Sequence, residues 1–346
     1  METVPVHELS FAEGVSKNSL TSKKRILSGM RPTGKLHLGH LVGALENWVA
    51  LQNEFNNFHL IADYHALTTN VDTKNLYQHS IDMVIDWLAA GIDPAKSPIF
   101  RQSRIKEHAE LHLLFSMLIT TARLERNPTL KDQVRDLNID TMSYGHLGYP
   151  VLQSSDILLY KGDVVPVGED QVPHIEITRE IARHFNNQYG VIFPEPEPRL
   201  TKFARLPGLD GNQKMSKSTG NTILLSDSPI EIQKKLKPAV TDPQKIRKGD
   251  RGHPDICLVF TYHQKFNAQE VAEIRNGCES GALGCVDCKK NCGEKIAHAL
   301  APMRDKRAHY ESHLDEVKDI IADGESRGRR VAEATMMEVH SAMSLG

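Results

Sequence analysis

The chain has no long run of apolar residues, and this absence excludes a whole class of proteins. No apolar stretch in its 346 residues approaches the roughly 18 that a membrane-spanning helix needs. Residues 1–24 are polar and contain no apolar segment, so we expect a flexible extension and not a secretory signal. We therefore predict a cytoplasmic protein without a membrane partner.

The chain also has little net charge and few cysteines. Its net charge is −2, so the molecule as a whole is not a polycation. The 40% apolar and 25% charged residues are typical of a soluble globular protein, and the length favours two domains. All five cysteines lie between Cys257 and Cys292. Clustered cysteines in a cytosolic chain indicate metal binding before disulfides.

Short apolar stretches alternate with helical patterns in the first half of the chain. The expected buried strands are residues 26–30, 58–62, 98–100 and 164–167. The expected helices include residues 81–88, closed by Gly91, and 111–119, 150–160 and 169–185. This β-α-β order with short connections predicts a Rossmann-type parallel sheet covered by helices. Such sheets bind nucleotides at the carboxyl ends of their strands.

The alternation stops beyond the middle of the chain. Three prolines within residues 194–198 break the pattern, and residues 207–220 are rich in Gly, Asn, Ser and Lys, as in a mobile loop. Helical patterns dominate after Ser228. The predicted division is a flexible extension (1–22), a Rossmann-type catalytic domain (23–205), a loop (206–222) and a helical domain (223–346).

Two short motifs suit the binding of phosphates. The first, Thr33 to His40 (TGKLHLGH), places two imidazoles and Gly39 at a helix start, where an anion is favoured and a base or ribose can approach the backbone. The second, Lys214 to Ser218 (KMSKS), puts two ammonium groups on the glycine-rich loop, where they could neutralise a departing pyrophosphate. Either could be incidental alone, but in this order they indicate a nucleotide site.

Together these motifs resemble those of class I aminoacyl-tRNA synthetases, and from about Ile26 onward the chain is similar to the bacterial tryptophanyl family. Ser28 to Gly34 resembles the family's ATP-binding opening, Leu36 to His40 its HIGH motif and Lys214 to Ser218 its KMSKS signature. The resemblance implies activation of L-tryptophan with ATP and Mg²⁺ to tryptophanyl-adenylate, and transfer to tRNA(Trp). It further implies a helical tRNA-binding domain and, as in many members, a homodimer.

The resemblance also assigns residues to this reaction. It implies catalytic roles for His37, His40, Lys214 and Lys217. The residues expected at ATP are Arg31, Pro32, Thr33, Gly39, His40, Lys131, Gly168, Glu169, Asp170, Arg205, Lys214, Met215, Ser216, Lys217 and Ser218. No general base is needed, because the substrate carboxylate is already an anion and attacks the α-phosphorus directly; catalysis is then positioning and charge stabilisation.

Two stretches favour tryptophan over tyrosine, whose synthetases share the fold and both motifs. Asp156 lies in an otherwise apolar helix and could simply face water, but the family places here the carboxylate that accepts the indole N–H. Residues 168–171 resemble a family segment whose aspartate meets the ribose hydroxyls and whose glutamine meets the substrate amino group. The expected amino-acid contacts are Asp156, Gln171, His65 and Gln153, the last in a position where many members carry Met.

Two other classes of function share part of this pattern. A nucleotidyltransferase without tRNA can carry the His-x-Gly-His motif, but it would need neither the late lysine loop nor a helical second domain. A metal-bearing RNA-binding module in the C-terminal part would add to catalysis and not replace it.

The cysteines form one group. Cys257, Cys278, Cys285 and Cys288 have the spacing C-x20-C-x6-C-x2-C, and Cys292 follows without an assigned role. Two coupled CxxC pairs would indicate zinc, whereas one CxxC with two distant partners fits a cubane iron–sulfur cluster at least as well. A subset of the tryptophanyl family carries a [4Fe-4S] cluster with nearly this pattern. The resemblance thus favours a cluster on these four residues, with zinc or free thiols as alternatives.

Overall fold

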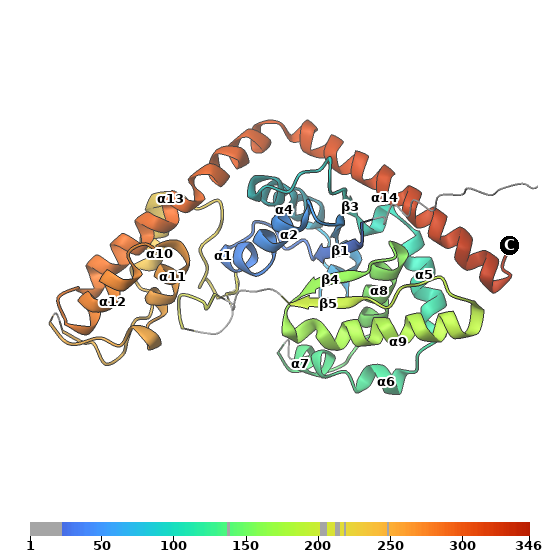
Figure 1. The fold of residues 1–346 in the computed structure, drawn as a ribbon, viewed down its shortest axis with the longest axis horizontal. Helices are drawn as coiled ribbons and strands as arrows, with labels where there is room; N and C mark the ends of the chain where they lie inside the picture. Colours follow the sequence, from blue (N-terminus) through green and yellow to red (C-terminus); the bar gives the residue numbers. More distant parts are fainter. Residues whose placement is uncertain (1–22, 137–138, 201–205, 212–214, 218, 248) are drawn as a thin grey trace, which may run out of the picture.

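The computed structural model describes residues 23–136, 139–200, 206–211, 215–217, 219–247 and 249–346, and its centre is a parallel five-stranded sheet (Figure 1). The strand order is β3-β2-β1-β4-β5. The strands are β1 (Arg25–Met30), β2 (Asn56–Ile61), β3 (Ile99–Arg101), β4 (Val164–Val167) and β5 (Glu197–Leu200). The chain order reverses between β1 and β4, which is where parallel sheets of this type bind ligands. The predicted Rossmann-type fold class is confirmed.

Helices and single helical turns connect these strands. In chain order they are α1 (Leu38–His40), the π-helical turn η1 (Leu41–Leu45), α2 (Glu46–Leu51), α3 (Asp63–Leu67), α4 (Leu76–Ala90), the 3₁₀ turn η2 (Gln102–Arg104), α5 (Glu107–Ser116), α6 (Thr121–Glu125), α7 (Pro128–Asp136), α8 (Tyr144–Leu159), the 3₁₀ turn η3 (Glu169–Gln171) and α9 (Val172–Tyr189). The predicted helix before Gly91 is α4; it buries its apolar face and ends at this glycine, whose φ of +110° is a left-handed cap.

The prediction that the strand pattern ends at the prolines was wrong for one segment. Residues Glu197–Leu200 form β5, which pairs with β4 at the edge of the sheet. Proline has no N–H to donate to a neighbouring strand, but one side of an edge strand has no neighbouring strand. The edge position therefore tolerates Pro198.

The C-terminal part is helical, as predicted, but it does not stay apart from the sheet. Its helices are α10 (Pro229–Leu236), the turn η4 (Pro254–Ile256), α11 (Leu258–Phe266), α12 (Val271–Glu279), α13 (Cys285–Ser312) and α14 (Leu314–Met343). Figure 1 shows α13 and α14 as an arch that runs from the α10–α12 group back across the sheet. A Cβ at Gly324 would lie 1.9 Å from the carbonyl oxygen of Ile99, so only glycine lets α14 pack this closely on β3.

Within the described residues, no helix combines the length and the apolar character that crossing a membrane requires.

Candidate active site

A cavity of about 290 Å³ opens between β1 and β4, at the carboxyl ends of the strands. The four residues predicted to contact the amino acid, Asp156, Gln171, His65 and Gln153, all line it. Arg31 joins them directly after β1. The lining also includes Thr68, Gln133 and Tyr149, which sequence reasoning did not single out. The cavity is large enough for an aromatic amino acid, and its polar groups converge from separate elements.

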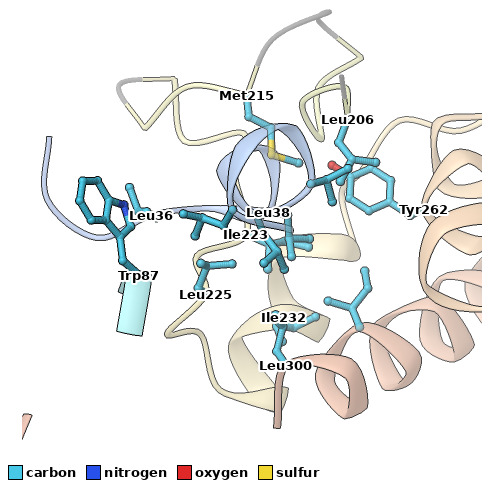
Figure 2. Close-up of a cluster of buried hydrophobic side chains, with 14 of the residues drawn as sticks. Leu36, Leu38, Trp87, Leu206, Met215, Ile223, Leu225, Ile232, Tyr262 and Leu300 are labelled. Carbon is cyan, nitrogen blue, oxygen red and sulfur yellow. The ribbon is translucent and has the colours of Figure 1, made fainter. Parts of the chain in front are cut away.

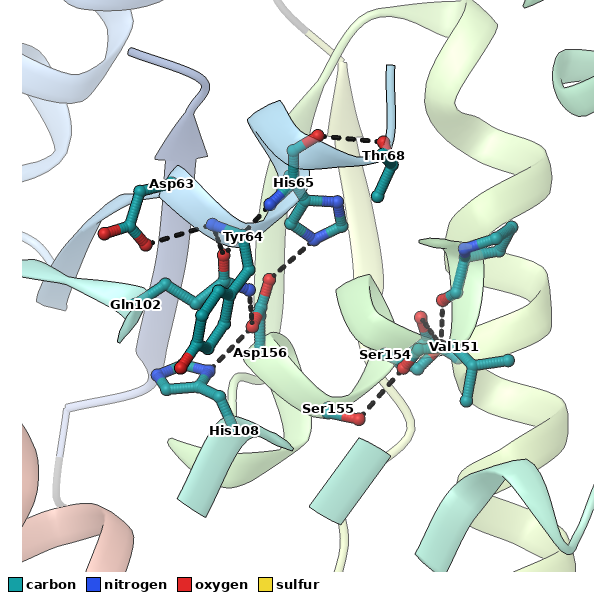
Figure 3. A network of polar contacts seen from close by, with 12 residues as sticks. Asp63, Tyr64, His65, Thr68, Gln102, His108, Val151, Ser154, Ser155 and Asp156 are labelled. Atoms are coloured by element: carbon teal, nitrogen blue, oxygen red, sulfur yellow. Dashed lines mark hydrogen bonds and ion pairs between the residues drawn. The ribbon is translucent and has the colours of Figure 1, made fainter. Parts of the chain in front are cut away.

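The Asp156 carboxylate is buried and bound by three donors (Figure 3). Its Oδ1 accepts from Gln102 Nε2 and His108 Nδ1, both at 2.7 Å. Its Oδ2 accepts from His65 Nε2 at 2.9 Å. A carboxylate offers about four acceptor positions, so these donors leave room for one more on Oδ2. The fourth position is the natural place for a ligand N–H, because Asp156 lines the cavity.

These hydrogen bonds keep Asp156 charged. Burial alone would raise the pKa of Asp156, but hydrogen bonds from His108 and His65 outweigh it and hold the pKa below its usual value. Since a carboxylate only accepts, His108 carries its proton on Nδ1, and its Nε2 accepts from the Tyr160 hydroxyl at 3.0 Å. The result is a fixed chain from Tyr160 through His108 to an ionised Asp156.

Gln102 and His108 are the functional residues that sequence reasoning missed. Gln102 is fully buried, and its Oε1 accepts the backbone N–H groups of Tyr64 (3.1 Å) and His65 (3.3 Å) while its amide donates to Asp156. One side chain thus locks the start of α3, which carries His65, to the carboxylate of α8. A single Gln or His gives no sequence signal, because its partners come from elements far apart in the chain.

A second buried network forms another wall of the cavity. The Tyr149 hydroxyl lies 2.5 Å from His174 Nε2 and accepts from Gln133 Nε2 at 3.0 Å. Asn127 Nδ2 donates to His174 Nδ1 at 2.9 Å, and burial lowers the pKa of His174 to about 4. A neutral His174 that accepts at Nδ1 carries its proton on Nε2 and donates to Tyr149. The Tyr149 proton is then left to donate toward the cavity.

The first phosphate motif forms a helix start in which the two histidines cap the backbone. His37 Nδ1 accepts from the Gly39 N–H at 3.1 Å, and His40 Nδ1 accepts from the His37 N–H at 3.2 Å. The two rings lie 3.8 Å apart between centroids. Because both Nδ1 atoms accept, a neutral ring carries its proton on Nε2 in each case. Both imidazoles are therefore oriented as Nε2–H donors, which suits an anion.

The second motif lies directly against the first. Lys217 Nζ donates to the Thr33 carbonyl oxygen, to Thr33 Oγ1 at 3.2 Å and to the Lys35 carbonyl oxygen at 3.0 Å. The Ser216 N–H donates to Asn221 Oδ1 at 2.7 Å. A Cβ at Gly39 would meet the His37 ring at 3.0 Å and Met215 Sδ at 3.4 Å. Gly39 thus allows the His37 ring and Met215 of the second motif to approach the backbone closely.

Backbone pairing and packing hold the two motifs together. The Leu38 N–H donates to the Ile223 carbonyl oxygen at 3.0 Å, and the Leu225 N–H donates to the Leu36 carbonyl oxygen at 2.9 Å. Figure 2 shows the apolar cluster at this junction. Its labelled members are Leu36, Leu38, Trp87, Leu206, Met215, Ile223, Leu225, Ile232, Tyr262 and Leu300. The core therefore connects the start of the sheet, the signature segment and the C-terminal helices.

The remaining predicted ATP residues come from the segment after β4, from α7 and from the end of β1. A Cβ at Gly168 would lie 2.7 Å from Asp170 Oδ1, so the Asp170 carboxylate packs directly against this glycine. Gln171 Nε2 donates to Asp170 Oδ2 at 3.1 Å, and Glu169 is exposed beside them. Lys131 is exposed on α7, and Pro32 is buried after β1. Arg205, Lys214, Ser218 and the predicted extension 1–22 lie outside the described residues.

The four predicted cysteine ligands line one small cavity in the C-terminal part. Cys257, Cys278, Cys285 and Cys288 share it with Thr241, Asp242, Lys245 and Leu283. All are free thiols, and burial together with the neighbouring thiols raises the pKa of Cys288 to about 12. In the described part of the chain, no three Cys, His, Asp or Glu side chains are grouped as they would be around a metal ion. Cys292 is buried and does not line the cavity.

The parallel sheet and the two joined phosphate motifs define a nucleotide-binding enzyme of the Rossmann type, and comparison with known proteins narrows this class. The family model of class I tRNA synthetases (W and Y) matches residues 19–301. The tryptophan–tRNA ligase of Thermotoga maritima is 51% identical over 93% of this chain and 99% of its own length. The one from Aquifex aeolicus is 43% identical over 93% of this chain and its full length.

A solved structure agrees with these sequence relationships. Campylobacter jejuni tryptophanyl-tRNA synthetase, complexed with ADP and tryptophan, has a TM-score of 0.84 and 34% identity over 92% of this chain and 99% of its own. The chain belongs to the class I tRNA synthetases, within the tryptophan–tRNA ligase family. The predicted function, an aminoacyl-tRNA ligase for tryptophan, is confirmed.

Proposed function

We propose that the cavity at the carboxyl ends of β1 and β4 binds L-tryptophan and that Asp156 selects it. The observation that carries this proposal is the buried carboxylate with three donors and one remaining acceptor position. The indole N–H is the only polar atom of that ring system, and Oδ2 would accept it. The side chains of Gln171 and Gln153 also line the cavity and would meet the amino group and the ring edge.

ATP would bind beside tryptophan, across the two joined motifs. His37 and His40 would present Nε2–H donors to the phosphates from the helix start. Lys217, with Lys214, would follow the pyrophosphate as it leaves. Residues 168–170 would hold the ribose, and Arg31, Pro32, Thr33 and Gly39 would line the nucleotide from the β1 side.

The chemistry needs no protein base. A carboxylate oxygen of tryptophan attacks the α-phosphorus, the bond to the bridging oxygen of pyrophosphate breaks, and tryptophanyl-adenylate remains. Mg²⁺ would neutralise charge on the departing pyrophosphate. The ammonium of Lys217 contributes most where that charge develops, which lowers the barrier more than it tightens ATP binding. The tRNA(Trp) 3′ end then takes the tryptophanyl group and releases AMP.

We further propose that Cys257, Cys278, Cys285 and Cys288, which line one cavity, hold a [4Fe-4S] cluster. Four free thiols line one small cavity, and Lys245 lies beside them. Burial raises the pKa of Cys278 and Cys288, and the positive charge of Lys245 only partly opposes this. A bound cluster would cross-link the loop before α11, α12 and α13 and so shape the surface offered to tRNA. Zinc is the alternative occupant.

Iron and acid-labile sulfide assays of protein purified without oxygen test the cluster. We expect about four of each per chain, bleaching by Cys285→Ser, and unchanged colour with Cys292→Ser as the matched control. Amino-acid activation should largely survive both changes. Stoichiometric zinc without iron would refute the cluster, and bleaching by Cys292→Ser would mean that the four ligands are chosen wrongly.

Three further expectations complete the proposal. The division into a catalytic domain (23–205), signature loop (206–222) and helical tRNA-binding domain (223–346) is retained, with α14 returning to cover β3. A homodimer is expected, and light scattering of the purified chain measures it. A cytoplasmic location is expected from the polar composition.

ATP–pyrophosphate exchange with each of the twenty amino acids tests the assigned substrate. Tryptophan alone should support strong exchange. Exchange with tyrosine that equals or exceeds exchange with tryptophan would overturn the assignment of Asp156.

A further inference from the structure

A buried carboxylate behind the first phosphate motif has no part in the chemistry described above. Asp86 lies on α4 with 1% of its side chain exposed. Its Oδ2 accepts the Leu36 N–H at 2.7 Å. Leu36 immediately precedes His37 and follows the turn Thr33–Lys35. Asp86 therefore fixes the backbone directly before the start of α1, where His37 and His40 lie.

Asp86 is in turn held by the C-terminal helix α13. Arg307 is 4% exposed, and its Nη1 pairs with Asp86 Oδ1. Arg307 Nη2 also pairs with Glu311 Oε1 at 3.0 Å, one turn further along α13. Removing one partner from a buried ion pair is costly, because the other charge stays desolvated. The pair joins residues 221 positions apart and ties α13 to the segment before His37.

Lys217 contacts the same short stretch of backbone. Its ammonium donates to the carbonyl oxygens of Thr33 and Lys35, directly before Leu36, whose N–H is bound by Asp86. The negative charges of Asp86 and Asp82 also act on Lys217, since they raise its pKa against the larger lowering by burial. The signature lysine and the buried pair therefore act on one short stretch of backbone.

We propose that Asp86 and Arg307 are positioning residues for ATP activation: α13, through this ion pair, sets the place of the turn 33–35 on which Lys217 closes. The proposal rests on the role of Lys217 given above. It makes α13, which begins at the cysteine cavity with Cys285 and Cys288, a direct mechanical link between that cavity and the phosphate motif.

A double-mutant cycle in ATP–pyrophosphate exchange tests this link. Arg307→Met should lower kcat about 10-fold at saturating ATP and leave KM for tryptophan unchanged, because the indole side is held by Gln102 and His108. Arg307→Lys should restore part of the lost kcat. In the Lys217→Ala background, Arg307→Met should cost less than 3-fold, because the positioned lysine is already gone.

The matched control is Glu325→Gln, which breaks the Arg101–Glu325 ion pair between β3 and α14 without touching the turn. It should leave kcat unchanged. Should Arg307→Met not fold, Asp86→Asn replaces it, since the amide still accepts from Leu36 while losing the ion pair.

Three results would overturn the inference. They are an unchanged kcat in the Arg307 and Asp86 variants, equal losses in Glu325→Gln, and full multiplicative loss when Lys217→Ala is combined with Arg307→Met. A normal kcat for Lys217→Ala alone would instead reject the assigned role of Lys217, and the kcat of Arg307→Met would still decide the positioning claim.

Discussion

The two halves of the proposed active site are built on different principles. On the amino-acid side, the Asp156 carboxylate is held by donors from η2, α3 and α5, and one acceptor position is left for a ligand. On the phosphate side, Lys217 donates to the backbone of Thr33 and Lys35. An ammonium has three donors, so a phosphate would take one of them while the others stay on the turn. The groups around Asp156 are thus already in place before tryptophan binds. The contacts of Lys217 with phosphate form only when ATP binds.

The difference has an energetic reason. A rigid, desolvated carboxylate rejects ligands that cannot satisfy it, because an unmet buried hydrogen bond costs about 1–3 kcal/mol. A lysine that binds most strongly when pyrophosphate leaves contributes to rate and not to ground-state affinity. Substitutions on the two sides should therefore affect different kinetic constants.

The largest effect is expected on the phosphate side. Lys217→Ala should lower the rate of adenylate formation by about 10²–10³, because it removes an electrostatic contact that strengthens in the transition state. The dissociation constant of ATP should change far less. Single-turnover kinetics with ATP titration separate the two quantities, and weaker ATP binding with a normal rate would contradict the transition-state role.

A smaller effect is expected on the amino-acid side. Asp156→Ala should lower kcat/KM for tryptophan by about 10–100-fold, because the indole N–H and the three former donors lose their acceptor. KM for ATP should be unaffected. Steady-state exchange at varied tryptophan measures this, and a parallel rise in KM for ATP would mean that the two halves are not separate.

The support of Asp156 should matter less than Asp156 itself. His108→Leu should raise KM for tryptophan about 10-fold, because one hydrogen bond to a charged carboxylate is worth about 1.5–3 kcal/mol and part of it is recovered by the other donors. His108→Asn keeps a donor near Nδ1 and should recover most of the affinity. If both variants behave alike, His108 supports the fold and not the orientation of Asp156.

His59 lies outside both halves, and its imidazole shows what burial alone does to the pKa of a histidine. His59 is fully buried on β2, stacked on Trp48 at 4.9 Å, and neither ring nitrogen has a hydrogen bond in the described structure. Burial lowers its pKa to about 3, below the ordinary 6.5. Its neutral form therefore supports folding above pH 6.5, and that support is lost as the pH falls toward 3.

Replacing this residue should reduce acid sensitivity. His59→Phe should shift the acid-unfolding midpoint to lower pH, as followed by circular dichroism. A midpoint that stays the same or rises would show that another group controls acid unfolding.

The elements that depend mainly on residues close together in the chain could be predicted from the sequence. The strands near 26–30, 58–62 and 164–167 and the helix closed by Gly91 follow from apolar spacing and a left-handed glycine cap. The convergence of Asp156, His65 and Gln171 on one cavity followed from the family resemblance, because spacing alone left Asp156 free to face water.

What could not be predicted depends on contacts between distant segments. Gln102 and His108 gain their roles only when the fold brings η2 and α5 to Asp156 on α8, and Asp86 only when Arg307 arrives from α13. The strand β5 was missed because prolines are tolerated at a sheet edge, and the sequence does not show which strand lies at the edge. The return of α14 onto β3 depends on the space left by Gly324.

The central claim, that Asp156 reads the indole N–H, is tested most directly with an isostere. The benzothiophene analogue of tryptophan has a sulfur in place of the N–H and nearly the same shape. The account predicts that the wild-type chain prefers tryptophan in pyrophosphate exchange by at least about 10-fold in kcat/KM, and that Asp156→Ala brings this ratio close to one. An equal ratio in the wild-type and variant enzymes would contradict the account.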